Sequence, residues 1–261
     1  MKSSDPIGRS AEAVEGWAAF HRWTQTPQGL RFLDAEQEVM DQILAGLFGY
    51  HLVQLGNLGD GELARASRTL RRFVLDPLAD ARSPQGCVSR PEQLAVRSDC
   101  IDVVVMPHTL EFCADPHEAL READRVLVPE GHLVLSVFNP MSLWGLRRWL
   151  DRRARAPWNG RTLAAGRLKD WLGLLGFETR SVCYYYRVRP FASGKVAGRT
   201  VRFLQSASEK MPGLAGGCLL LARKKVSTLT PIRPRWAPRP RLVAARMMEP
   251  TLRSSRVRRA G

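Results

Sequence analysis

The chain has 261 residues, of which 44% are hydrophobic and 25% are charged, and its formal net charge is +15. This length and composition suit one α/β domain with appendages, or at most two small domains. They exclude a collagen-like chain, a wholly disordered chain and a miniprotein stapled by disulfides.

The sequence carries no sign of a membrane or a secreted location. No apolar run approaches the roughly 18–20 residues of a membrane-spanning helix, and the N-terminus lacks the apolar segment of a signal peptide. We therefore expect a cytoplasmic protein, without a transmembrane segment. The scattered cysteines form no CxxC pair, so we expect reduced thiols in or near the core and no metal site; they are Cys87, Cys100, Cys113, Cys183 and Cys218.

Residues 1–48 are expected to form a helical lead-in to the main domain. Trp17, Phe20 and Trp23 recur at helical spacing, which favours a helix packed onto the body over a binding box. Residues 26–29 then predict a turn.

A second helix is expected to follow that turn. Asp34 with Gln37 three residues later predicts its start through a capping box. An apolar stripe continues the pattern, and Gly49 predicts the end of the helix.

The next segment alternates between strand and helix patterns. Residues 52–55 predict a strand that runs into a glycine-rich turn, and residues 62–72 predict a helix. A short apolar run then ends at Asp76, and a third strand is expected near Cys87.

The clearest strand pattern in the chain is the apolar run 101–106. Asp115 followed by Pro116 predicts the N-cap and first residue of a helix. Residues 129–131 predict a turn before another buried strand at 132–138.

The last patterned elements are a helix at 167–176, a strand at 177–186 and a strand at 218–222, after a poorly patterned stretch. Nearly all-apolar strands that alternate with helices are typical of a parallel sheet covered on both faces. In such sheets, ligands bind outside the carboxyl ends of the strands. The first such end is Leu55, and the glycine-rich turn after it is either a ligand-binding loop or only a tight turn.

The run SDCIDVVVMPHTLEFCADPHEALREADRVLVPEGHLVLSVFNP, residues 98–140, resembles class I S-adenosylmethionine-dependent methyltransferases of the type-11 family. The resemblance covers most of residues 50–190, and the helical lead-in and the segment FNPMSLWGLRR, residues 138–148, resemble a bacterial subgroup of that family. It implies a three-layer Rossmann-like α/β fold with seven strands and an antiparallel last pair, in a domain over 49–225. It also implies S-adenosylmethionine as cofactor and an unidentified methyl acceptor as partner.

The resemblance implies a cofactor site at the strand ends. It places Gly56, Asn57 and Gly59 at the methionine end of the cofactor, with Gln54 where the family carries an acid, and it places Asp76 on the ribose hydroxyls. It implies that Glu92 and Gln93, with Leu94, flank the adenine, and that His108 and Thr109 lie beside the sulfonium.

The resemblance also suggests where the chemistry occurs. A base is needed only if the acceptor loses a proton, and His108 and Glu111 are the candidates. Each has a structural alternative: His108 as a hydrogen-bonding residue of its loop, and Glu111 as a capping or solvent-facing residue. The loop that holds Asn139 and Trp144 is expected to close over the substrate pocket.

Three positions depart from the family pattern. Gln54 brings no charge to the α-ammonium of the cofactor, Leu58 stands where a glycine is expected, and Arg90 stands where an acid is expected. The alternative function is therefore a catalytically inactive methyltransferase-fold protein that binds RNA or another polyanion. A nicotinamide enzyme is disfavoured, because the glycine turn lacks the GxGxxG spacing.

Residues 226–261 carry nine arginines, five prolines and one acid, which is a net charge of +8. The spacing of the prolines forbids a long helix, so we expect a disordered tail. The tail is either a solvated segment or a weak electrostatic contact for RNA or an anionic membrane.

Overall fold

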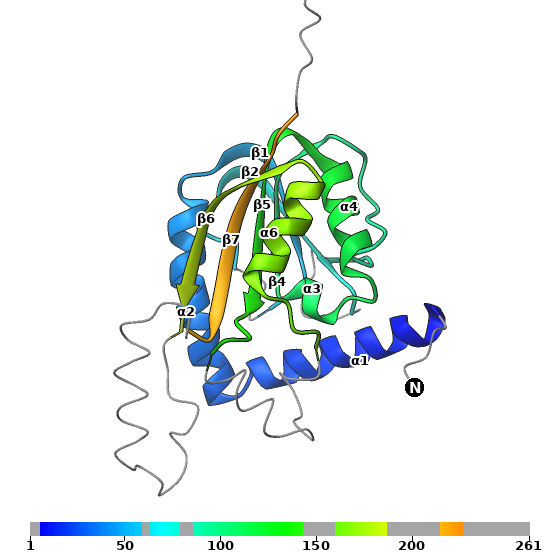
Figure 1. Ribbon diagram of the computed structural model, residues 1–261, viewed down its shortest axis with the longest axis vertical. Coiled ribbons are helices and arrows are strands. Elements are labelled where there is room, and N and C mark those ends of the chain that lie inside the picture. Colours follow the sequence, from blue (N-terminus) through cyan, green and yellow to red (C-terminus); the bar gives the residue numbers. More distant parts are fainter. Residues whose placement is uncertain (1–5, 59–62, 79–85, 143–159, 187–214, 227–261) are drawn as a thin grey trace, which may run out of the picture. The chain divides into compact units, whose positions relative to one another are not determined.

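The computed structural model describes residues 6–58, 63–78, 86–142, 160–186 and 215–226 (Figure 1). Within them, one sheet has the strand order β3-β2-β1-β4-β5-β7-β6, and β7 runs antiparallel to both neighbours while the other pairs are parallel. The expected seven-stranded sheet with an antiparallel last pair is confirmed. The strands are β1 (Phe48–Leu55), β2 (Arg68–Asp76), β3 (Gly86–Val88), β4 (Ile101–Pro107), β5 (Leu127–Phe138), β6 (Phe177–Tyr185) and β7 (Gly217–Lys224).

Helices pack on both faces of the sheet and make three layers. Successive residues of a strand point to opposite faces: Leu52 and Val103 pack with α1 and α2, whereas Val53 and Val104 pack with α4 and α6. The continuous apolar runs of β1 and β4 follow from this double burial. The helices are α1 (Pro6–Thr24), α2 (Pro27–Leu44), α3 (Thr109–Phe112), α4 (Pro116–Val126) and α6 (Ala165–Leu174).

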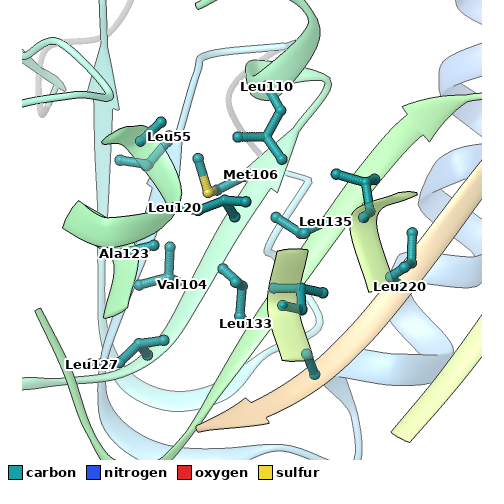
Figure 2. Close-up of a cluster of buried hydrophobic side chains, with 14 of the residues drawn as sticks. Leu55, Val104, Met106, Leu110, Leu120, Ala123, Leu127, Leu133, Leu135 and Leu220 are labelled. Atoms are coloured by element: carbon teal, nitrogen blue, oxygen red, sulfur yellow. The ribbon is translucent and has the colours of Figure 1, made fainter. Parts of the chain in front are cut away.

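The core between the sheet and α4 fixes the layer on that face (Figure 2). Leu120 and Ala123 of α4 meet Met106 of β4 and Leu135 of β5, and all four side chains are fully buried. Each buried leucine contributes about 1.5–3 kcal/mol through the removal of apolar surface from water. This packing holds the carboxyl ends of the strands, and the loops that follow them, in fixed positions.

α2 begins earlier than the sequence pattern predicts. The hydroxyl of Thr26 accepts a hydrogen bond from the amide of Gly29 at 3.1 Å, and Pro27 takes the first helical position. Thr26 is therefore an N-cap, and a proline fits there because the first helical residue needs no N–H donor. The expected turn and the expected start at Asp34 are wrong, since Asp34 lies inside the helix.

The boundary between helix and strand also differs around β1 and β2. β1 starts at Phe48, so Gly49 does not end a helix, and β2 replaces the predicted helix from Arg68 onward. The parallel register pairs Phe48 with Arg68 and Leu55 with Leu75, along the whole of β1. Pairing with a neighbouring strand overrides the local helical pattern of the arginine-rich segment.

The turn predicted at 129–131 lies inside β5 as an irregularity. Ile101 pairs with Leu127, whereas Val103 already pairs with His132, so β5 has extra residues opposite β4. Glu130, one of these extra residues, has a positive φ of 66°. The chain does bend here, but beyond the bend the strand pairs with β4 again, in a shifted register.

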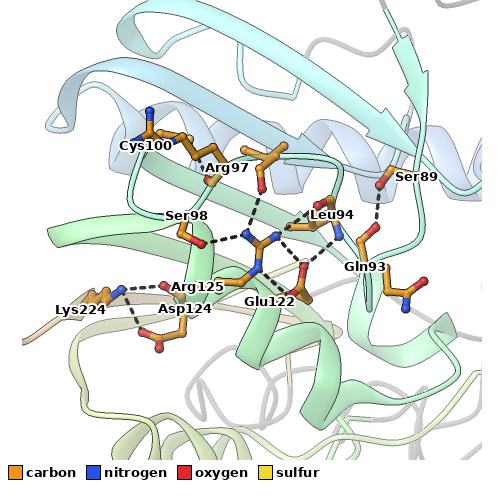
Figure 3. A network of polar contacts seen from close by, with 11 residues as sticks. Ser89, Gln93, Leu94, Arg97, Ser98, Cys100, Glu122, Asp124, Arg125 and Lys224 are labelled. Carbon is orange, nitrogen blue, oxygen red and sulfur yellow. Dashed lines mark hydrogen bonds and ion pairs between the residues drawn. The ribbon is translucent and has the colours of Figure 1, made fainter.

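A polar network ties α4 to the segment between β3 and β4 (Figure 3). The guanidinium of Arg125 bonds both carboxylate oxygens of Glu122, at 2.8 and 2.9 Å, and donates to the carbonyls of Leu94 and Val96. Glu122 in turn accepts the amide of Leu94 at 2.9 Å. These bonds position the segment that leads from β3 to the pocket described below.

α1 lies across the end of the sheet where the parallel strands finish, next to α3 (Figure 1). Trp17 and Phe20 of α1 are buried, with 2% and 0% of their surface exposed. The expectation that this aromatic helix packs onto the body is confirmed. Among the described residues, no helix combines the length and apolarity needed to cross a membrane.

Candidate functional site

The loop after β1 turns sharply at Gly56, which has a φ of +103°. The amide of Gly56 donates to the carbonyl of Leu75 at 2.7 Å, and the hydroxyl of Thr109 donates to the carbonyl of Leu55 at 2.6 Å. Only glycine adopts this backbone conformation without strain. The ends of β1, β2 and β4 are thus held together around one glycine.

Asp76 ends β2 and is the acceptor at the centre of this edge. One carboxylate oxygen accepts the amide of Asn57 at 2.6 Å. The other accepts the amide of Leu78 at 2.7 Å and the indole N–H of Trp17 at 3.2 Å. Asp76 is only 6% exposed, so its charge is met by these donors rather than by water.

Two buried acceptors beside this loop lack hydrogen-bond donors. Oε1 of Gln54 and Oδ1 of Asn57 have no partner in the described part of the chain, although Nε2 of Gln54 donates to the carbonyl of Gly56 at 2.8 Å. Both side chains are buried, at 0% and 5% exposure. Unpaired buried acceptors are costly, so they mark a place where a ligand with donor groups fits.

A pocket of about 380 Å³, including its open mouth, lies between α1 and the loops after β2, β3 and β4. Its lining residues are Ser10, Ala13, Val14, Trp17, Pro77, Arg90, Pro91, Glu92, Thr109, Phe112, Cys113 and Ala114.

The residues expected near an adenine have different positions. Glu92 lines the pocket, and its carboxylate also accepts the amides of Ala114 and Asp115 at 2.6 and 3.1 Å. Gln93 is exposed and is not a lining residue. Glu92 therefore shapes the pocket wall by holding the start of α4, whereas Gln93 lies outside it.

His108 follows β4 in a left-handed conformation, with φ of 53°. Its amide donates to the carbonyl of Ser136 in β5 at 3.0 Å. A residue other than glycine rarely adopts this conformation, and such strain is concentrated at functional sites.

The imidazole of His108 lies between two carboxylates and a phenol. Nδ1 lies 2.6 Å from Glu111 Oε2, and Nε2 lies 3.3 Å from the hydroxyl of Tyr185 and 3.5 Å from Glu36 Oε2. The other oxygen of Glu36 accepts a hydrogen bond from the hydroxyl of Ser136. The side chains that make up this His108 cluster are nearly or fully buried; they are His108, Glu36, Glu111 and Tyr185.

This environment keeps His108 protonated. Burial by itself lowers the pKa of the imidazole, but the charge of Glu36 and the hydrogen bond to Glu111 outweigh it and raise the pKa to about 9. Burial also raises the pKa of the Tyr185 hydroxyl well above its usual value. At neutral pH, the cluster therefore holds an imidazolium and a neutral phenol.

Aromatic rings enclose the His108 cluster. The rings of Phe20, Phe32 and Phe138 lie 5.2, 5.4 and 4.3 Å from the imidazole, centroid to centroid. Phe20 also stacks on Phe112 at 4.8 Å, and Phe112 lines the pocket. These two stacked rings separate the pocket from the imidazole.

Asn139 follows β5 and organises its own loop. Its Nδ2 donates to the carbonyl of Ala215 at 2.9 Å, and its Oδ1 accepts the amide of Met141 at 3.1 Å. The side chain is 7% exposed. The structure thus gives Asn139 a part in the geometry of its loop. Asn139 follows β5 as His108 follows β4, so both lie at the same end of the sheet.

Several sequence expectations fall outside the described residues. They include Gly59 of the glycine loop, Trp144 of the expected substrate loop, and residues 227–261, which are all but the first residue of the basic tail. All five cysteines lie in the described part and are free thiols, of which Cys113 and Cys218 are buried and Cys87 is exposed.

The sequence analysis missed Glu36 and Tyr185, and it assigned Trp17 to packing alone. Glu36 gave one signal in the sequence, because this acidic residue lies at helical spacing from the apolar residues Phe32 and Met40. In the structure its exposure is 0%. Tyr185 sits in a run of three tyrosines whose orientations no local pattern distinguishes.

Comparison with known proteins gives a consistent set of relatives. A family model described as a methyltransferase domain matches residues 62–135. The uncharacterized protein YafS of Escherichia coli (strain K12) is 32% identical over 209 residues, which span 80% of this chain and 82% of YafS.

Solved structures share the fold at low identity. A SAM-dependent methyltransferase from Thermotoga maritima aligns with a TM-score of 0.60 and 19% identity, covering 80% of this chain and 100% of the other. An S-adenosylmethionine-dependent methyltransferase from Mesorhizobium loti aligns with a TM-score of 0.51 and 16% identity, covering 73% and 99% of the two chains.

Proposed function

Because this chain belongs to the class I methyltransferase family, whose cofactor is S-adenosylmethionine, we propose that it transfers a methyl group to an acceptor bound beside His108. The observation that carries this proposal is the position of Asp76. Its carboxylate lies at the end of β2, bonded to the loop after β1 and next to an open pocket.

The residues around the pocket fit the cofactor at two places. The unpaired oxygens of Gln54 and Asn57 suit a ligand that brings N–H donors, as an α-ammonium does. We place the adenine in the pocket between Pro77 and Thr109, and the two ribose hydroxyls on Asp76, which precedes Pro77 and is bonded to the lining residue Trp17. Next to Gly56 the space holds the indole of Trp17.

When bound, S-adenosylmethionine supplies a methyl group on a sulfonium, which is already a good leaving group. The chain then has mainly to orient the acceptor, and orientation alone removes several kcal/mol from a barrier. We assign this task to the loops after β4 and β5, which carry His108 and Asn139. Their backbones are held by β5 and by the turn before β7.

The His108 cluster supplies the proton chemistry in this proposal. Because His108 keeps its proton at neutral pH, it acts there as a cation or an acid. A proton that leaves the acceptor then goes to a carboxylate of the cluster, on Glu111 or Glu36. His108 becomes a base only when the pH rises to about 9.

Calorimetry with S-adenosylhomocysteine, the demethylated product, tests the proposal without knowledge of the acceptor. We expect micromolar affinity for the unaltered chain and a loss of about tenfold or more in Asp76→Asn, because charge-assisted hydrogen bonds are about 1.5–3 kcal/mol each.

Asp102→Asn is the matched control for that experiment. Asp102 also accepts two backbone amides, those of Tyr50 and His51, both at 2.9 Å, but at the opposite end of β1. This variant should bind as the unaltered chain does. A folded chain that gives no heat with millimolar S-adenosylhomocysteine would refute the proposed function.

A further inference from the structure

We propose that Trp17 sets the affinity of the cofactor site by competing with the cofactor for Asp76 and for the surface of Gly56. The indole occupies both in the structure, and a bound cofactor displaces it. This inference rests on the proposed function, because it concerns the same site. It assigns to α1 a role that its sequence, read as a packing helix, did not indicate.

The first observation is the hydrogen bond from the Trp17 indole to Asp76, 3.2 Å long. The other two donors to this carboxylate are the backbone amides of Asn57 and Leu78, which the loops hold in place. The indole N–H is therefore the donor that a side-chain movement exchanges most easily. A ribose hydroxyl is a donor of the same kind and fits the same carboxylate oxygen.

The second observation is the contact between the indole and Gly56. A methyl group built on the α-carbon of Gly56 would lie 2.5 Å from Cζ2 of Trp17 and 3.7 Å from the Thr109 hydroxyl oxygen. A glycine with positive φ leaves its backbone open to close approach by a ligand. Here the ring of Trp17 fills that approach, so a ligand reaches Gly56 only after the ring has moved.

The third observation is that α1 forms one wall of the pocket. Its lining residues follow the spacing i, i+3, i+4 and i+7, which is one face of a helix, and they are Ser10, Ala13, Val14 and Trp17. A ligand in the pocket therefore touches the same helix face that carries the competing indole. Binding and displacement of Trp17 are coupled through this face.

Displacement of Trp17 also changes the barrier next to it. Its ring lies 5.8 Å from Phe20 and 6.0 Å from Phe112, and these two rings separate the pocket from His108. When the indole moves, the stacked pair loses a neighbour on the pocket side. Cofactor binding thus loosens the packing of Phe20 and Phe112, the two rings that separate the pocket from the His108 cluster. The acceptor has to enter at this place.

Competition of this kind lowers the apparent affinity by the fraction of molecules in which the site is open. Trp17→Phe keeps a ring but removes the N–H, so it tests the competition for Asp76. Trp17→Ala removes the ring as well and tests the contact with Gly56. We expect Trp17→Phe to bind S-adenosylhomocysteine about tenfold tighter, which is the effect of one hydrogen bond to a charged carboxylate, and Trp17→Ala to bind more tightly still.

The matched control is Trp23→Phe. Trp23 lies on the same helix and packs on Phe20, Phe32 and Phe138, with centroids at 5.8, 5.7 and 6.1 Å, but it is not a lining residue of the pocket. Its replacement should leave the dissociation constant unchanged. Because Trp17→Ala removes a buried ring and threatens folding, each variant is first checked by urea unfolding, and Trp17→Phe alone is sufficient for the test.

A second measurement follows Trp17 itself, by fluorine NMR of the chain that keeps this residue. In protein labelled with 5-fluorotryptophan, the fluorine signal that is missing from Trp17→Phe belongs to Trp17. We expect this signal to move on saturation with S-adenosylhomocysteine, while that of Trp23 moves less.

The outcomes separate this inference from the proposed function. Tighter binding by the Trp17 variants supports the inference. Equal or weaker binding by Trp17→Phe, or a fluorine signal that stays in place at saturation, overturns the inference and leaves the methyltransferase proposal standing. No binding by any folded variant overturns both.

Discussion

Glu36 of α2 and His108 after β4 meet inside the site, with Oε2 of the carboxylate 3.5 Å from Nε2 of the imidazole. Neither side chain is exposed to solvent. Glu111 bonds the other ring nitrogen at 2.6 Å, so the imidazole is held between two acids. This arrangement makes the charge of His108 part of the stability of the fold as well as of the proposed chemistry.

We predict that the stability of the folded chain falls as the pH rises above neutrality. Glu36 and Glu111 raise the pKa of His108 from 6.5 to about 9, against the effect of burial. The stabilisation is therefore complete below pH 6.5 and is lost as the pH passes through about 9. Urea unfolding should show a decrease of up to about 3 kcal/mol over this range, and His108→Gln should abolish it.

His132→Gln is the control for that pH series. Burial lowers the pKa of His132, so its contribution is present above pH 6.5 and is lost as the pH falls. This variant should keep the decrease at alkaline pH. A wild-type stability that stays level from neutral to alkaline pH would contradict the assigned role of His108.

Glu36→Gln tests the positioning of His108 from α2. Removal of the carboxylate charge should lower the pKa of His108, because the charge of Glu36 is the largest effect that raises it. NMR titration of the imidazole carbon resonances measures this pKa directly. Ser136→Ala leaves the charge in place and removes the hydrogen bonds of the Ser136 hydroxyl, which donates to Glu36 and accepts the amide of His108 at 3.3 Å, so it should shift the pKa much less. Equal pKa values in wild type and Glu36→Gln would refute the assignment.

Gly56→Ala should destabilise the chain by at least about 2 kcal/mol, because the added methyl group meets the Trp17 ring and the residue keeps a positive φ. Gly173→Ala is the matched control. Gly173 lies in α6 with open space around its α-carbon, so alanine should stabilise the helix by up to about 1 kcal/mol. Thermal unfolding of both variants measures the difference, and similar shifts in Tm would argue against the close contact.

Arg125→Lys should destabilise the chain by about 1–2 kcal/mol. Lysine cannot reproduce the two bonds to Glu122 together with those to the carbonyls of Leu94 and Val96 (Figure 3). Arg121→Lys on the same helix is the control, because its ion pair with Glu118 is exposed and such pairs contribute little. Urea unfolding of both variants gives the comparison, and equal losses would show that the network adds nothing.

Local sequence patterns predicted the layered sheet well. The run 101–106 is apolar except for Asp102, because β4 is buried on both faces, and this pattern depends only on neighbouring residues. The cap of α4 was equally readable, since Asp115 accepts the amide of His117 two residues later. The same patterns were wrong at β2, where pairing with β1 decides the conformation of an arginine-rich segment.

Only some residues of the candidate site could be predicted from the sequence. The resemblance to the type-11 methyltransferases pointed to Asp76 and His108, and in the structure Asp76 ends β2 and His108 follows β4, at one edge of the sheet. Their partners could not be predicted, because Trp17 and Glu36 come from helices that precede the sheet in the chain. No spacing rule connects residues so far apart.

The sequence by itself determined the class of fold and most of its strands, because periodicity, caps and glycine turns depend on residues a few positions apart. The acids and the histidine at the strand ends were pointed out only by the resemblance to a methyltransferase family. Only the tertiary structure decided that Trp17 lies on Asp76, and that Glu36 and Glu111 hold His108 in its protonated form. Those contacts depend on how α1 and α2 pack across the end of the sheet, which is a property of the whole core.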